Sequence, residues 1–136
     1  MTMNEQNRAL ALRWMEEVWN QRREEAVDEL MHADAVGHME GGDVHGPAGF
    51  KIARAAFLEA IPDLRIDVED SLAEGDQVVL RWRVTGTHRG AGLGIPPSGR
   101  RVEARGMSWF RLRDGKLAEG WDSWDQSGLM KALSPP

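Results

Sequence analysis

The 136-residue chain contains no cysteine and no tyrosine. The absence of cysteine excludes disulfide bonds, thiolate catalysis and zinc–thiolate sites. Because tyrosine is missing too, acid–base and hydrogen-bonding roles must fall to Asp, Glu, His, Ser, Thr, Asn, Gln or Trp. No apolar run approaches the length of a membrane span, and the N-terminus lacks the apolar core of a signal peptide. We therefore expect a cytoplasmic protein with no membrane partner.

Basic residues are also fewer than acidic residues. Lys and Arg number 17 against 22 Asp and Glu, which leaves a formal net charge of -5. Nucleic-acid binding requires a basic patch, so we expect no nucleic-acid partner. The arginines between Arg81 and Arg113 fall mainly on predicted strands, which indicates a solvated, ion-paired outer face. The hydrophobic fraction of 41% allows a compact core, and the length suits a single domain over residues 1–136.

The first half of the chain carries helical patterns. Apolar residues recur every three or four positions over residues 4–21 and again over 23–31 and 48–60, which predicts three helices. A proline precedes the third segment and another follows it, as is typical of helix boundaries. A short extended piece, residues 36–39, lies between the second and third helices.

The second half alternates between apolar and polar residues, as strands do. Segments 64–69, 77–88, 101–113 and 116–126 predict four strands, and Asp114-Gly115 is a hairpin turn between the last two. Helices followed by strands indicate an α+β fold: a cone-shaped, curved antiparallel sheet with three N-terminal helices packed on its concave face. Such a cone is a natural pocket for a small apolar ligand.

The last predicted strand holds the candidate catalytic residue, Asp125. Strict alternation places five residues on one face: Leu117, Glu119, Trp121, Ser123 and Asp125. If that face lines the pocket, Asp125 lies beside Trp121 in a partly dry space, where desolvation raises the pKa of a carboxyl group and suits it to proton transfer. The alternative is that Asp125 ends the strand in solvent or caps the next segment. Asp122, of opposite parity, is the competing carboxylate.

Two histidines are further candidates. His38, on the short extended piece, could orient Asp125 or bond a substrate carbonyl, because histidine titrates near neutral pH. The alternative is a structural histidine bonded to the backbone. His88 could contact substrate, or it could hold the Gly- and Pro-rich loop of residues 89–99. None of the four histidines is paired at a spacing typical of metal ligands, so we expect no metal site.

Tryptophan is abundant, with six residues. Trp82, Trp109 and Trp121 are candidates for the substrate-binding wall of the pocket, together with Trp124. Core packing is the commoner use of tryptophan, and the two roles are compatible.

Taken together, several segments resemble the SnoaL-like polyketide cyclases, often called ester cyclases, of the nuclear-transport-factor-2-like superfamily. The resemblance runs over nearly the whole chain and depends on the order and spacing of its motifs. These are Glu17-Val18-Trp19-Asn20, His38, Ile61-Pro62-Asp63-Leu64, Glu74-Gly75-Asp76, Arg81-Trp82, Thr85-Gly86-Thr87-His88-Arg89-Gly90, Gly94-Ile95-Pro96-Pro97-Ser98-Gly99-Arg100, Phe110-Arg111 with Asp114-Gly115-Lys116, and Trp121 with Asp125.

The resemblance implies an enzyme without metal or organic cofactor that closes a ring by an intramolecular aldol reaction on a small apolar carbonyl or ester compound. In that family an aspartate of the last long strand is the general acid/base, and Asp125 best matches its position. His38 and indole N–H groups would then hold the enolate. The resemblance also implies a homodimer or homotetramer paired through the sheet. Family members often end in Gln-Leu-Gly, whereas this chain has Lys131-Ala132-Leu133-Ser134, which bears on a subunit contact.

Other functions of the same fold stay open, because a fold does not determine a function. One is a small-molecule-binding module without catalysis. Another is an enzyme that resembles ketosteroid isomerase or an epoxide hydrolase. The epoxide hydrolase needs an Asp-Arg-Asp relay inside the cone, for which Arg81, Arg83 or Arg105 could supply the arginine.

Overall fold

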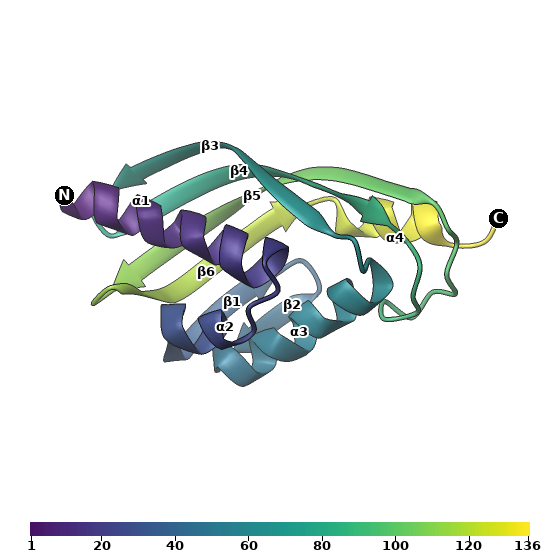
Figure 1. Cartoon of the computed structure of the whole chain (residues 1–136), viewed down its shortest axis with the longest axis horizontal. Coiled ribbons are helices and arrows are strands. Elements are labelled where there is room, and N and C mark those ends of the chain that lie inside the picture. The colour runs from purple at the N-terminus through teal and green to yellow at the C-terminus, as the bar shows by residue number, and fades with distance from the viewer.

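The computed structural model describes residues 1–136 as a single curved sheet with helices on one face (Figure 1). The six strands lie in the order β2-β1-β6-β5-β4-β3. Their bounds are β1 (Met31–Met39), β2 (Gly42–His45), β3 (Arg65–Glu74), β4 (Gln77–Thr87), β5 (Arg101–Arg113) and β6 (Lys116–Trp124). The α+β architecture with a curved sheet is therefore confirmed.

The N-terminal helices form where the apolar spacing predicts them. Helix α1 (Met3–Arg13) begins at a capping box, in which Thr2 and Glu5 bond each other's backbone N–H groups. It continues directly into a π-helical segment, η1 (Trp14–Asn20). Two further helices, α2 (Glu25–Leu30) and α3 (Gly46–Ala60), complete the layer that covers the sheet. A fourth, α4 (Gln126–Leu133), follows β6 in a tail that the sequence pattern did not identify as helical.

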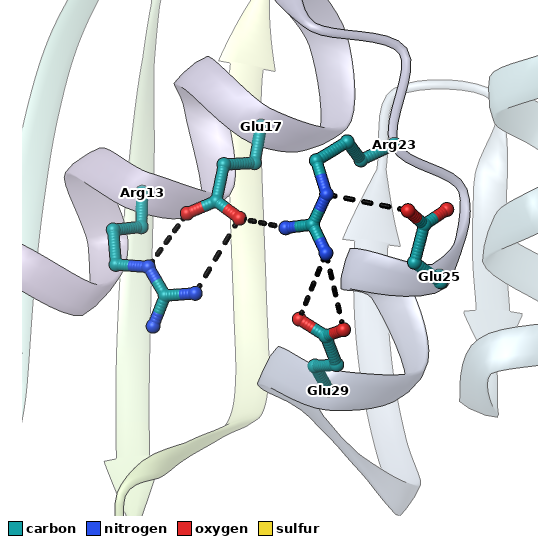
Figure 2. A network of polar contacts seen from close by, with 5 residues as sticks. All are labelled: Arg13, Glu17, Arg23, Glu25 and Glu29. Atoms are coloured by element: carbon teal, nitrogen blue, oxygen red, sulfur yellow. Dashed lines mark hydrogen bonds and ion pairs between the residues drawn. The ribbon is translucent and has the colours of Figure 1, made fainter.

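Ion pairs on the surface join η1 to α2 (Figure 2). Arg13 and Glu17 pair at 2.6 Å, and Glu17 also contacts Arg23. Arg23 then reaches Glu25 and Glu29 of α2 at 3.2 and 3.1 Å. The hydrogen bond that Glu17 accepts from Arg13 lowers the pKa of the Glu17 carboxyl group. Exposed pairs of this kind each contribute little, typically under about 1 kcal/mol, so the network orients the turn more than it stabilises the fold.

The sheet contains more strands than the pattern predicted. The antiparallel pairing of β3, β4, β5 and β6 agrees with the expected order. The short extended piece near residue 38 is part of a longer strand, β1, which joins β6 in parallel. β1 also forms a hairpin with β2, a strand of four residues that the sequence pattern did not predict.

Alternation divides the sheet into two faces. The inner face, toward the helices, carries the buried residues of β4 and β5, which include Val78, Leu80, Val102 and Phe110. Aromatic side chains of the helices complete this core, with the rings of Trp14 and Phe50 centred 4.8 Å apart. The outer face carries the arginines and glutamates of the same strands. None of the helices is both long and apolar enough to cross a membrane.

Candidate active site

An apolar cavity lies between the inner face of the sheet and the helices. Of its 24 lining residues, 19 are hydrophobic. Ser108, Glu119 and Asp122 are the lining residues that carry a hydroxyl or carboxyl group. The carboxylate of Glu119 is already engaged by Arg111 and His38. Asp122 is therefore the carboxylate that remains for a ligand in the cavity.

Asp122 is joined to two neighbours by a chain of hydrogen bonds on the inner face. Its Oδ1 lies 2.6 Å from the hydroxyl of Ser108, which in turn lies 2.9 Å from the indole Nε1 of Trp82. Burial raises the pKa of Asp122, the Ser108 hydrogen bond opposes that rise, and the nearby charge of Glu40 adds to it. Asp122 is thus a carboxyl group that retains its proton to a higher pH than usual, at the wall of an apolar cavity.

Asp125 does not lie in this cavity, so its predicted placement is wrong. β6 ends at Trp124, and Asp125 is the N-cap of α4, where its Oδ1 accepts the backbone N–H of Gly128 at 2.9 Å. The side chain is exposed and borders a second, more polar hollow with Glu40 and Ser127. This is the capping arrangement given above as the alternative.

The reason is a β-bulge in β6. Leu112 pairs with Leu117 and Arg111 with Glu119, so Ala118 has no partner in β5. A bulged residue reverses the alternation that follows it. Leu117 remains on the inner face, while Glu119 and the residues that share its parity turn outward. The inner positions after the bulge are Gly120, Asp122 and Trp124, all of which line the cavity.

His38 and Trp121 lie together on the outer face. Their rings stack with centroids 5.4 Å apart. His38 Nδ1 lies 2.9 Å from Asp43 Oδ1, and Nε2 lies 2.7 Å from Glu119 Oε2. The bond to Glu119 and then the bond to Asp43 raise the pKa of His38. The predicted placement of His38 beside the catalytic aspartate is therefore wrong, because β1 turns it away from the cavity.

Of the remaining residues predicted for the site, one lines the cavity and the others lie elsewhere. Trp82 lines the cavity as expected. Trp109 pairs directly with Trp121 across β5 and β6, and both are exposed on the outer face, so neither walls the pocket. His88 is fully buried beneath the loop before β5, where its Nδ1 accepts the backbone N–H of Ser98. That contact agrees with the loop-holding alternative.

Two alternatives can be tested against this geometry. Arg83 and Arg105 pair with Glu103 and Glu69 on the outer face, and no arginine lines the cavity, so an Asp-Arg-Asp relay is not assembled there. No three His, Asp or Glu side chains are placed to hold a metal ion.

The residue that the sequence pattern missed is Ser108. It is the only hydroxyl among the inward positions of β5, and such an isolated polar residue is the signal that could have identified it.

The chain is similar to known proteins over nearly its full length. A family model described as SnoaL-like polyketide cyclase matches residues 9–133. The chain is 29% identical to the nogalonic acid methyl ester cyclase of Streptomyces nogalater, over 90% of this chain and 93% of that protein. It is 28% identical to the aklanonic acid methyl ester cyclase of Streptomyces peucetius, over 92% and 89%. A solved SnoaL-like polyketide cyclase from Jannaschia sp. CCS1 has a TM-score of 0.92 at 30% identity, over 100% of this chain and 96% of that chain.

Proposed function

The chain belongs to the SnoaL-like polyketide cyclase family, and we propose that it closes a ring by an intramolecular aldol reaction, with Asp122 as the general acid and base. The substrate is a small, mainly apolar carbonyl or ester compound. One observation carries the proposal: Asp122 is the one titratable side chain left free for a ligand in an otherwise apolar cavity. Asp122, and not Asp125, therefore takes the role that the family assigns to an aspartate of the last strand.

The chemistry needs only one carboxyl group. The Asp122 carboxylate removes a proton from a carbon next to a carbonyl, and the electron pair of the C–H bond becomes an enolate. The enolate carbon forms a C–C bond to a second carbonyl carbon of the same molecule, whose π electrons move to its oxygen. Asp122 returns its proton to that oxygen. The product is an isomer of the substrate, and nothing is oxidised or reduced.

The environment of Asp122 suits both the removal of the proton from carbon and its return to oxygen. A catalytic acid/base works best when its pKa approaches the working pH, and burial raises the pKa of Asp122 in that direction. The apolar lining excludes water, which strengthens every polar contact inside. The indole N–H groups of Trp14, Trp19 and Trp124, which line the cavity, are the candidates to hold the enolate oxygen.

We also propose that the outer face of the sheet pairs with a second copy of the chain. Leu72, Val79, Trp109 and Trp121 stand in register across four neighbouring strands, and three of them are among the most exposed apolar side chains of the molecule. Arg–Glu ion pairs flank this row, so each copy presents positive and negative charges side by side. Two copies can therefore meet without a net repulsion. Proteins usually cover an exposed apolar face of this kind.

The ring-closing activity is tested with the substrates that the relatives' names supply. Purified protein is incubated with nogalonic acid methyl ester and, separately, with aklanonic acid methyl ester. The products are separated by chromatography, and their masses are measured by mass spectrometry. We expect at least one ester to give a new species of unchanged mass. If both esters bind, as seen by quenching of tryptophan fluorescence, and neither is converted, the chain is a binding module and the proposed reaction is wrong.

A further inference from the structure

A tryptophan, a glycine and a serine on two neighbouring strands converge on Asp122. Trp82 of β4 pairs with Gly106 of β5, and Ser108, two residues further on, pairs with Asp122 of β6. A Cβ atom at Gly106 would lie 2.7 Å from the Cζ2 and Cη2 atoms of the Trp82 ring. A real side chain there would collide with the ring. Glycine at this position therefore lets the indole lie across β5 and reach Ser108.

The direction of each hydrogen bond in this group follows from its chemistry. An indole Nε1–H can only donate, so the Ser108 oxygen accepts from Trp82. Ser108 has one proton of its own, and its hydroxyl lies 2.6 Å from Oδ1 of Asp122. The side chain of Ser108 is buried and contacts no other acceptor. Ser108 therefore donates to Oδ1, and Oδ1 is occupied in both charge states of Asp122.

We propose that Trp82 and Ser108 are positioning residues, which confine the proton handled by Asp122 to Oδ2. This inference rests on the proposed role of Asp122 in ring closure. Oδ2 has no hydrogen-bond partner in the protein and belongs to a residue that lines the cavity. Because the oxygen that accepts from Ser108 already has a donor, the proton of the neutral carboxyl group is favoured on the other oxygen, which has no partner in the protein. The proton is presented from one fixed atom, which is the condition that efficient proton transfer requires.

Gly106 is the third member of this arrangement, although it carries no functional group. Its role is to let the indole lie low enough to donate to Ser108. The Cβ of a Gly106→Ala variant would lie 2.7 Å from the Trp82 ring and from Cβ of Trp124, so these side chains would have to move. Movement of the ring would weaken the Trp82–Ser108 bond. The Ser108 hydroxyl would then be free to turn away from Oδ1.

The test uses four variants of the full chain. Ser108→Ala removes the donor to Oδ1, Ser108→Thr retains a hydroxyl, and Trp82→Phe removes only the indole N–H from an aromatic side chain. Ser123→Ala is the matched control, because it deletes a serine hydroxyl from the outer face next to Asp122. Thermal unfolding confirms that each variant folds, and the two readouts are carboxyl NMR titration of Asp122 and the pH profile of kcat/KM for ring closure.

The expected results differ in direction from those of a purely structural role. Loss of the donor raises the pKa of Asp122 further, because the Ser108 bond favours the charged form. The rising limb of kcat/KM therefore moves to higher pH in Ser108→Ala, and to a smaller extent in Trp82→Phe. We expect kcat to fall roughly tenfold to a hundredfold in Ser108→Ala with little change in KM. In Ser108→Thr and Ser123→Ala we expect the rising limb of kcat/KM to stay at the same pH as in the wild type.

An unchanged titration of Asp122 in both Ser108→Ala and Trp82→Phe overturns the positioning roles, whatever happens to the rate. The proposed function fails separately, if Asp122→Asn still closes the ring. Titration of Asp122 does not need turnover, so the two failures cannot be confused.

Discussion

Leu117 and Asp122 both face the cavity, although they occupy positions of opposite parity on one strand. The unpaired Ala118 between Leu117 and Glu119 makes this possible, because a bulge reverses the alternation of side chains. The same bulge turns Glu119 and Trp121 to the outer face. One residue in β6 thus decides which carboxylate is presented to a ligand and which aromatic residue is presented to a partner.

The stability of the fold should depend on pH through Asp122. Its pKa in the folded state lies above the value of about 3.9 for an exposed aspartate. Between these two values the native state binds more protons than the unfolded state, so the free energy of unfolding falls as the pH rises. Asp122→Asn removes this loss. We expect the variant to gain thermal stability relative to wild type at pH 8 and to gain little at pH 4, as measured by circular dichroism.

The Asp125→Asn variant is the control for that comparison, since Asn is also a good N-cap and Asp125 is exposed. Asp125→Asn should not gain thermal stability at pH 8. An equal gain by Asp122→Asn at both pH values would contradict the raised pKa of Asp122.

His38 should make the opposite contribution. Bonds to Glu119 and Asp43 raise its pKa, so its stabilising charge is fully present below the ordinary value of about 6.5 and is lost as the pH rises through the folded pKa. Arg111 shares the Glu119 carboxylate with His38. We expect His38→Gln to lower the melting temperature more at pH 5.5 than at pH 8.5. A loss independent of pH would show that the imidazole acts only by packing on Trp121.

Association through the outer face can be tested by placing a charge in its apolar row. Trp109 is 49% exposed on the outer face, and Ile52 is 74% exposed on α3, on the opposite side of the sheet. We expect light scattering to report a dimer or tetramer for wild type and for Ile52→Glu, and a monomer for Trp109→Glu at the same concentration. A wild-type monomer at high micromolar concentration would refute the pairing.

Much of the fold could be predicted from the sequence, because its signals are local. The apolar spacing of the helices and the alternation of β4 and β5 agree with the observed elements. β2 was missed because it has four residues, and the glycine-rich turn before it hides its pattern. The parallel pairing of β1 with β6 joins segments that are distant along the chain, and no local pattern reports it.

The site was predicted less well than the fold, for a physical reason. A bulge depends on how two strands pair, and alternation within one strand carries no trace of it. Counting in twos from Leu117 therefore led to Asp125, while the true inward carboxylate was the competitor Asp122. The apolar cavity and Trp82 as part of its wall followed from patterns that the bulge does not affect.

The role of Asp122 is tested most directly by a matched pair of variants. Asp122→Asn and Asp125→Asn make the same chemical change three residues apart, one at the cavity wall and one at a helix cap. Both are assayed for ring closure on the methyl ester that wild type converts, with substrate binding measured by fluorescence. We expect Asp122→Asn to lose roughly 10²- to 10⁴-fold in kcat while it still binds the ester, and Asp125→Asn to remain close to wild type. Full turnover by Asp122→Asn, or its loss in Asp125→Asn alone, would contradict the assignment.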